Sequence, residues 1–169
     1  MVNIYFPHPP RELYQPRWVV EGIVAKAQRP GYPLNKPPLE KIQEWADIVK
    51  GMGVKSILCI MDDAQVDQYD FLNLDGGGLF GFYKTLGFKI AHIPADDYKR
   101  PPLNDQELDA VWAAFERLEK PVLIHCSAGR DRTGAALDLI LWKLGKTEAD
   151  DAVDPDFDAL SSAPPPTGR

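Results

Sequence analysis

Cysteine, histidine and long apolar runs are scarce in this sequence. Its 169 residues include two cysteines, Cys59 and Cys126, and three histidines. Two cysteines are too few for a disulfide framework, and three histidines give no support for a metal site. No apolar run approaches the roughly 18 residues that suggest a membrane span, and the first residues lack the pattern of a secretory signal. We therefore expect a protein of the reducing cytoplasm, with no transmembrane segment and no metal or other cofactor.

A surplus of positive charge is also absent. The 19 lysine and arginine residues stand against 25 aspartate and glutamate residues, which gives a net charge of -6. This balance argues against a nucleic-acid partner, which requires a basic patch or stripe. The hydrophobic fraction of 44% is enough to bury a core. We expect one domain over residues 1–169, with an extended lead-in at 1–17 and a tail from about 154 to 169.

Alternating apolar patterns predict an α/β fold. A helix is expected after Asn104, whose capping box would be completed by Glu107. Helical spacing predicts three more helices, at 39–52, 79–86 and 133–144. Short apolar runs predict four strands, at 18–25, 55–61, 88–93 and 122–124. Residues 62–78 show no clear pattern. The alternation favours a single domain with a central, mostly parallel sheet flanked by helices.

One segment carries chemistry. Residues 125–134 read H-C-S-A-G-R-D-R-T-G, between a predicted strand and a predicted helix. A loop that turns tightly into a helix N-terminus points several backbone N–H groups into one concavity, where the helix dipole adds partial positive charge. Such a nest binds a phosphate dianion, and it also favours the thiolate form of a cysteine at its base. Gly129 permits the unusual backbone angles that the loop needs. Cys126 is therefore the candidate nucleophile.

Three further side chains of this segment have predicted roles around Cys126. The planar guanidinium of Arg132 suits bidentate binding of two phosphate oxygens, and it would stabilise the charge that develops in the transition state. His125 would orient the loop through its ring nitrogens. Thr133 would donate a hydrogen bond to the sulfur, which helps the sulfur to leave from a phosphocysteine intermediate.

The pattern H-C-x-x-G-x-x-R-[ST]-G, filled here by residues 125–134, resembles the signature of the protein tyrosine phosphatase superfamily, especially its compact dual-specificity and atypical branch. The resemblance implies a protein tyrosine or dual-specificity type phosphatase, with a phosphatase-like fold, a phosphocysteine intermediate and no metal or cofactor. It also implies that the partner is a phosphorylated protein, a phosphorylated small molecule or a lipid head group.

In that family an aspartate on a loop upstream of the signature protonates the leaving oxygen. The corresponding segment here reads I-P-A-D-D-Y-K-R-P-P, and we call it the acid loop (residues 93–102). In the atypical branch the acid often lies three residues after one proline and four before another. Asp97 meets both conditions. Asp96 is the adjacent alternative, and Asp131 within the signature is a third.

The residues between the nucleophile and the arginine would surround the substrate: Ser127, Ala128, Gly129, Arg130 and Asp131. A basic residue before D-R-T-G resembles bacterial and lipid phosphatases of the family. Arg130 either reaches a second phosphate, or pairs with a carboxylate such as Asp131 and faces solvent. Rim charge is expected from Lys26, Arg29, Lys99 and Arg100. The predicted substrates are phosphotyrosine, together with phosphoserine, phosphothreonine, phosphoinositides or inositol phosphates.

Cys59 lies in the strand predicted at 55–61. In some family members a cysteine on the corresponding strand forms a reversible disulfide with the nucleophile, which makes Cys59 a candidate redox partner of Cys126. The other interpretation, which we favour, is a small buried hydrophobic residue.

Two other functions are compatible with the signature. Rhodanese-like sulfur transfer or thiol redox chemistry also places a cysteine in an anion cradle, but Arg132 followed by Thr133, and the upstream aspartates, favour a phosphatase. A phospho-binding pseudophosphatase is the non-enzymatic alternative, and the intact motif gives no reason to prefer it.

Overall fold

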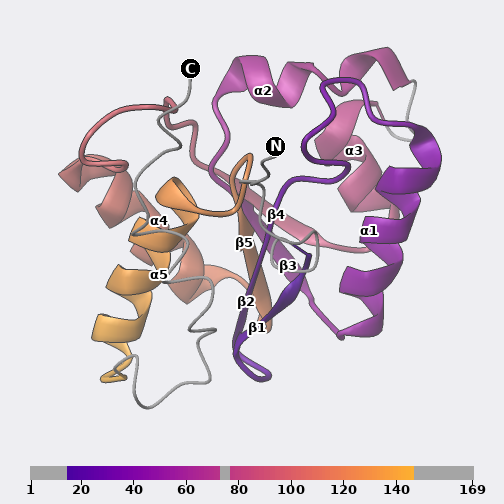
Figure 1. The fold of residues 1–169 in the computed structure, drawn as a ribbon. Helices are drawn as coiled ribbons and strands as arrows, with labels where there is room; N and C mark the ends of the chain where they lie inside the picture. The colour runs from indigo at the N-terminus through magenta and orange to yellow at the C-terminus, as the bar shows by residue number, and fades with distance from the viewer. Residues whose placement is uncertain (1–14, 73–76, 147–169) are drawn as a thin grey trace, which may run out of the picture.

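Five short strands form one sheet through the middle of the protein (Figure 1). The computed structural model describes residues 15–72 and 77–146. Strands β2, β5, β3 and β4 are parallel, whereas β1 at one edge is antiparallel to β2. The predicted α/β fold with a mostly parallel sheet is therefore confirmed. Across the sheet the order is β1 (Arg17–Val20), β2 (Val24–Ala27), β5 (Val122–His125), β3 (Ser56–Cys59) and β4 (Lys89–His92).

The single strand predicted at 18–25 is wrong, because the chain reverses within it. β1 ends at Val20, β2 begins at Val24, and the two pair as an antiparallel hairpin. Gly22 has a φ of +78°, which a residue with a side chain rarely adopts, and the N–H of Ile23 donates to the carbonyl of Val20 over 3.0 Å. Apolar residues on both sides of the turn conceal it in the sequence.

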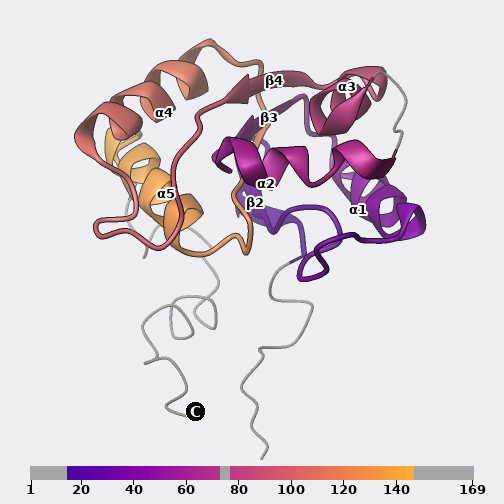
Figure 2. The ribbon, with the colours of Figure 1, turned by 90° about the horizontal axis from the view of Figure 1, so that it is seen from above.

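Helices cover both faces of the sheet (Figure 1, Figure 2). On one face lie α4 (Asp105–Arg117) and α5 (Asp131–Lys143). On the other lie α1 (Leu39–Gly51) and α3 (Gly78–Thr85). This arrangement buries the parallel strands on both sides, as a sheet of this kind requires.

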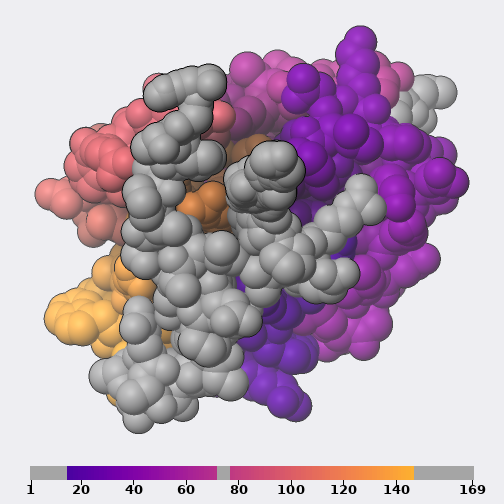
Figure 3. Space-filling view, viewed as in Figure 1, coloured from indigo at the N-terminus to yellow at the C-terminus, as the bar shows by residue number. Residues whose placement is uncertain are grey.

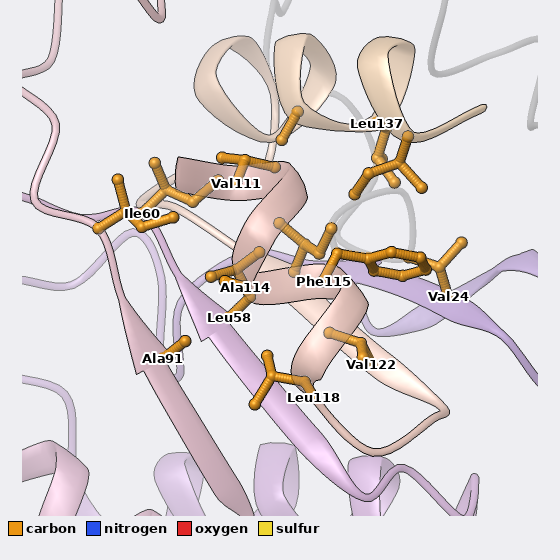
Figure 4. Packing of buried hydrophobic residues seen from close by; sticks show 14 of the residues in the cluster. Val24, Leu58, Ile60, Ala91, Val111, Ala114, Phe115, Leu118, Val122 and Leu137 are labelled. Carbon is orange, nitrogen blue, oxygen red and sulfur yellow. The ribbon is translucent and has the colours of Figure 1, made fainter. Parts of the chain in front are cut away.

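Side chains of the strands alternate between the two faces. Along β3, Leu58 belongs to the cluster that packs against α4 and α5, whereas Ile57 and Cys59 belong to the cluster beneath α1 and α3. Figure 4 shows the first cluster, in which Val111 and Phe115 of α4 point toward the strands. Both cores therefore rest on the same parallel strands, of which β2, β3 and β5 are buried along their whole length.

Capping residues set the helix boundaries. The predicted capping box of α4 is confirmed: Asn104 Oδ1 accepts from the Glu107 N–H over 2.8 Å, and Glu107 Oε1 accepts from the Asn104 N–H over 2.9 Å. Helix α5 begins at Asp131, two residues before the start predicted from its apolar pattern. The first turn of α5 is polar, so it gives no apolar signal, and it carries Arg132.

Residues 62–78, which show no pattern in the sequence, contain the short helix α2 (Asp63–Asp67) and the 3-10 turn η2 (Asp70–Leu72). A five-residue helix is too short to show periodicity. Its start is marked by a second capping box, in which the Asp62 side chain accepts from the Gln65 N–H over 2.8 Å.

Within the described ranges, no helix has the length and apolar character needed to cross a membrane. Most of the predicted lead-in and the whole predicted tail lie outside the described residues, and β1 already begins at Arg17.

Candidate active site

The signature loop (residues 125–134) begins where β5 ends, at the carboxyl edge of the parallel strands. Ligands bind at this edge in open α/β sheets. The Arg29 N–H donates to the Ser127 carbonyl over 2.8 Å, and the Ile60 N–H donates to the His125 carbonyl over 2.9 Å. These bonds fix the loop to the segments that follow β2 and β3. In Figure 3, orange atoms in the colour range of this loop are visible at the surface.

Gly129 is the position where the loop requires glycine. Its φ is +77°, and a Cβ built there would lie 2.6 Å from the carbonyl oxygen of Ala27 and 2.9 Å from the nitrogen of Gln28. Both are backbone atoms, so neither can move aside without displacing the end of β2. The loop therefore passes directly over that strand end, and any side chain at this position would push the two apart.

A cavity of about 210 Å³ opens over the signature loop. It brings together the predicted nucleophile Cys126, the predicted clamp Arg132 and the predicted acid Asp97. The described residues that line it are Tyr32, Asp97, Tyr98, Cys126, Ser127, Ala128, Arg130, Asp131 and Arg132. Asp96 is exposed and does not line the cavity, and neither do the buried residues His125 and Thr133. Of the three candidate acids, the cavity thus includes Asp97 and Asp131.

Protein acceptors hold the Arg132 guanidinium, whose side chain is only 2% exposed. Its Nη1 donates to Ala95 O at 2.7 Å, to Gln65 Oε1 at 2.9 Å and to Ile60 O at 3.2 Å. Its Nη2 forms a 2.9 Å ion pair with Asp97 Oδ2. Its Nε is buried and has no acceptor in the described part of the chain. Leaving a buried donor unpaired costs about 1–3 kcal/mol, and an oxygen of a bound phosphate would remove that cost.

Gln65, on α2, joins the two charged groups. Its Oε1 accepts from Arg132 Nη1, and its Nε2 donates to Asp97 Oδ2 over 3.1 Å. The same oxygen accepts from the Asp62 N–H over 3.3 Å. Only this orientation of the amide satisfies all three neighbours, because a carboxylate cannot donate and a guanidinium cannot accept. Gln65 therefore fixes Asp97 and Arg132 relative to each other.

His125 bonds to the backbone of the predicted nucleophile. Its Nδ1 lies 2.9 Å from Cys126 O, and its Nε2 lies 2.9 Å from Tyr83 Oη. A carbonyl only accepts, so Nδ1 carries the proton and Nε2 accepts from the Tyr83 hydroxyl. Burial lowers the pKa of His125 from 6.5 to about 4, so the ring is neutral near pH 7. Burial also raises the pKa of Tyr83 well above 10, which keeps its hydroxyl a donor.

Two residues expected to add charge at the rim are instead buried. Lys26 and Arg29 are each 4% exposed. The Nε of Arg29 donates to Ser127 Oγ over 3.1 Å, so this side chain braces the signature loop from inside. The position of Arg29 after β2 could not show from the sequence whether its side chain faces solvent or supports the loop from inside.

The charges expected from the acid loop are also placed differently. Lys99 Nζ forms a 2.5 Å ion pair with Glu107 Oε1 and does not line the cavity. Arg100 is exposed and lies outside the lining. Arg130 and Asp131 both line it, so a role of Arg130 toward a second phosphate stays a prediction.

The two cysteines are free thiols in separate core clusters. Cys59 is fully buried, and this burial raises the pKa of its thiol to about 12. In this conformation Cys59 packs as a small hydrophobic residue, and its pairing with Cys126 stays a prediction. The expected hydrogen bond from Thr133 to the sulfur is absent, since Thr133 Oγ1 has no partner among the residues that the structure describes.

Four residues of the site were not predicted from the sequence as its members: Gln65, Tyr83, Tyr32 and Tyr98. The D-D-A-Q capping pattern is a signal for the start of α2, but no signal connects Gln65 to the acid loop. Tyr98, the next residue after Asp97, is 98% exposed at the cavity, with a φ of +61°. No three potential ligands for a metal ion cluster among the described residues.

Comparisons with known proteins concern the family and the fold of this chain. The model of the tyrosine phosphatase family matches residues 88–159, which include the acid loop and the signature loop. No curated protein matches the chain by sequence.

Several solved structures have a similar fold. The core catalytic domain of the PP-IP phosphatase SIW14 from S. cerevisiae is 18% identical, over 91% of this chain and 78% of its own, with a TM-score of 0.56. A mutant form of Tk-PTP is 17% identical, over 81% and 77%, with a TM-score of 0.51. A putative phosphatase (DUF442) from Shewanella putrefaciens CN-32 is 20% identical, over 85% and 90%, with a TM-score of 0.51. The predicted resemblance is confirmed: this chain has the fold of compact phosphatases, and it carries the sequence pattern of the tyrosine phosphatase family over residues 88–159.

Proposed function

We propose that this protein is a cysteine-dependent phosphomonoester hydrolase that acts through a phosphocysteine intermediate. The observation that carries the proposal is the convergence of Cys126, Arg132 and Asp97 on one cavity beside the first turn of α5. These side chains supply a nucleophile, a bidentate cation and a proton donor, the three groups that the reaction needs. They come from two separate loops, so their meeting is a property of the fold and not of one motif.

In the first step the Cys126 thiolate attacks phosphorus in line with the leaving group. The bond from phosphorus to the leaving oxygen breaks, and Asp97 gives that oxygen its proton. In the second step water attacks the phosphocysteine, Asp97 accepts a proton from the water, and the bond from sulfur to phosphorus breaks. Inorganic phosphate leaves, and the thiolate is restored.

Two N–H groups of Arg132, on Nε and Nη2, are the proposed donors to the phosphate. Its buried Nε lacks an acceptor in the described ranges, and its Nη2 is bonded to Asp97. A bound dianion would accept from both N–H groups and would replace Asp97 at Nη2. The carboxylate that it releases takes up a proton from solvent, and the resulting carboxylic acid lies beside the cavity, where the leaving oxygen emerges. One exchange of partners thus binds the phosphate and frees the acid.

Hydrolysis of phenyl phosphate tests the proposal. The wild-type protein should release phosphate, Cys126→Ser should not, and Asp97→Asn should be at least about tenfold slower, because phenolate is a poor leaving group. Asp96→Asn is the matched control and should keep most of the activity. An unchanged rate for Asp97→Asn would transfer the acid role to Asp96 or Asp131.

Two further measurements, compared with the hydrolysis of phenyl phosphate, separate the other two functions. Turnover of thiosulfate without hydrolysis of phenyl phosphate would support sulfur transfer. Binding of a phosphopeptide without any turnover by the wild-type protein would support a pseudophosphatase.

The substrate proposal is phosphotyrosine, with phosphoserine, phosphothreonine and phosphorylated inositols or inositol lipids as further candidates. Tyr32 and Tyr98 line the cavity and offer flat surfaces to an aromatic leaving group. The similar SIW14 structure is described as a PP-IP phosphatase, which supports testing inositol phosphates as well. A panel of phosphotyrosine peptide, phosphothreonine peptide and inositol phosphates would rank them. A cytoplasmic location remains part of the proposal, since a catalytic thiol requires a reducing environment.

A further inference from the structure

A second cavity, of about 330 Å³, adjoins the first. Tyr32, Tyr98 and Ser127 line both cavities, so the two share one wall. The other lining residues are Arg29, Pro33, Asn35, Gln65 and Gln68. This lining includes one cation and three side-chain amides, but no carboxylate. Its composition is therefore suited to an anion and not to a cation.

Arg29 is a buried cation, and no described residue supplies a matching anion. It is 4% exposed, and no carboxylate lies within ion-pair distance of it in the described ranges. Its Nε donates to Ser127 Oγ, and its Nη1 donates to Leu34 O at 2.9 Å and to Tyr69 Oη at 3.2 Å. All three acceptors are neutral, and Nη2 has no acceptor among the described residues.

Arg132 provides a comparison within the same site. Both arginines are almost fully buried, but Arg132 has Asp97 as a counter-ion, whereas Arg29 has none among the residues that the structure describes. Burying a charge is unfavourable unless an anion or strong hydrogen bonds compensate it. The Tyr32 ring, whose centroid lies 5.4 Å from the Arg29 guanidinium, supplies only a cation–π contact. Arg29 therefore keeps a donor and a positive charge at the wall of the second cavity.

We propose that the second cavity binds a second phosphate of the substrate while the first phosphate lies over Cys126. Arg29 supplies the positive charge, and the amides of Asn35 and Gln68 supply neutral donors. Because Ser127 lines both cavities and also bonds to Arg29, the two phosphates lie on either side of one residue. The preferred substrate is then a small molecule with two phosphate groups close together. This inference rests on the proposed function and narrows it.

Binding to the Cys126→Ser protein tests the proposal without turnover. Calorimetry would compare phenyl phosphate with benzene 1,2-, 1,3- and 1,4-bisphosphate, which share one ring and differ in the spacing of the second group. At least one bisphosphate should bind about tenfold more tightly than phenyl phosphate, the gain expected from one additional charge-assisted hydrogen bond. Equal affinities for all four compounds would overturn the proposal.

Added negative charges locate the second phosphate. In the Cys126→Ser background, Asn35→Asp and Gln68→Glu each place a carboxylate at the cavity and should remove most of the preference for the bisphosphate. Gln106→Glu, an exposed residue of α4 outside both cavities, is the matched control and should leave the preference unchanged. Arg29 is unsuitable for this comparison, because its loss would also release Ser127.

Arg130 is the competing location, since it lines only the first cavity. A preference that survives Asn35→Asp and Gln68→Glu but disappears in Arg130→Met would place the second phosphate there and overturn the proposal. Failure of the proposed function would look different: the wild-type protein would release no phosphate from phenyl phosphate, whatever the binding ratios.

Discussion

Replacing Gln65 with leucine separates the placement of the acid from the rest of the reaction. The side chain contacts neither phosphorus nor leaving group in the proposed mechanism, but its amide joins Asp97 and Arg132 through bonds of 3.1 and 2.9 Å. Leucine has a similar volume and no polar atoms. The variant therefore keeps the apolar volume at α2 and removes both bonds, together with the 3.3 Å bond that the Asp62 N–H donates to Gln65 Oε1.

The magnitude follows from these two bonds. A hydrogen bond to a charged group is worth about 1.5–3 kcal/mol, and about 2 kcal/mol of lost transition-state stabilisation corresponds to roughly 30-fold in rate. The ceiling is the whole contribution of a general acid, about 10²–10⁴-fold. We expect kcat for phenyl phosphate to fall about 10- to 100-fold. For 4-nitrophenyl phosphate, whose leaving group needs less help from an acid, we expect less than about threefold.

The assay is steady-state phosphate release from the two substrates by wild type, Gln65→Leu and Asp62→Ala. Asp62 forms the other half of the α2 capping box and has no hydrogen bond to Asp97 or Arg132, so Asp62→Ala is the matched control. It should cost about 1 kcal/mol of stability without changing the ratio of the two rates. Two results would refute the positioning role of Gln65. One is an equal loss of rate on both substrates in Gln65→Leu, and the other is a change in the ratio of the two rates in Asp62→Ala as large as in Gln65→Leu.

Three other predictions concern the support of the signature loop, and a fourth concerns the two cysteines. Gly129→Ala should abolish phosphate release and lower the free energy of unfolding, measured by urea denaturation, because its methyl group would meet backbone at 2.6 Å. The depressed pKa of His125, about 4 against 6.5, means that the unfolded chain binds a proton first. About 3 kcal/mol of stability should be lost as the pH falls from 6.5 to 4, and a flat profile would contradict neutral burial. Tyr83→Phe should lower the free energy of unfolding by about 1–2 kcal/mol, measured by thermal denaturation, because it leaves Nε2 of His125 unpaired. Peptide mapping after mild peroxide should find no disulfide between Cys59 and Cys126, and a linked peptide would reverse our preference.

The sequence predicts the parts of the site that are contiguous. The signature loop contains the nucleophile, the arginine and the required glycine within ten letters, and its position between a strand and a helix is visible from the apolar pattern. The spacing of the flanking prolines also marks Asp97, which lines the same cavity as Cys126 and Arg132. Their catalytic roles stay predictions.

The supporting residues could not be predicted, because they meet only through the sheet. Gln65 follows β3 and Arg29 follows β2, and each reaches the signature loop only after parallel pairing brings the strand ends to one edge. The same limit explains why Arg29 was placed at the rim. A basic residue after a strand looks the same in the sequence whether it faces solvent or braces a loop from inside.

The contact between Gly129 and the end of β2 bears on protein engineering. Ten consecutive residues look like a portable phosphate-binding cassette that could be grafted between any strand and helix. Here the backbone of Ala27 and Gln28 forms a floor, because Gly129 of the cassette packs directly against it. A transplant that carried the ten residues alone would lack this floor and would relax into another shape. The smallest unit that can be moved is three pieces: β2 with the two residues after it, β5, and the loop with the first turn of α5.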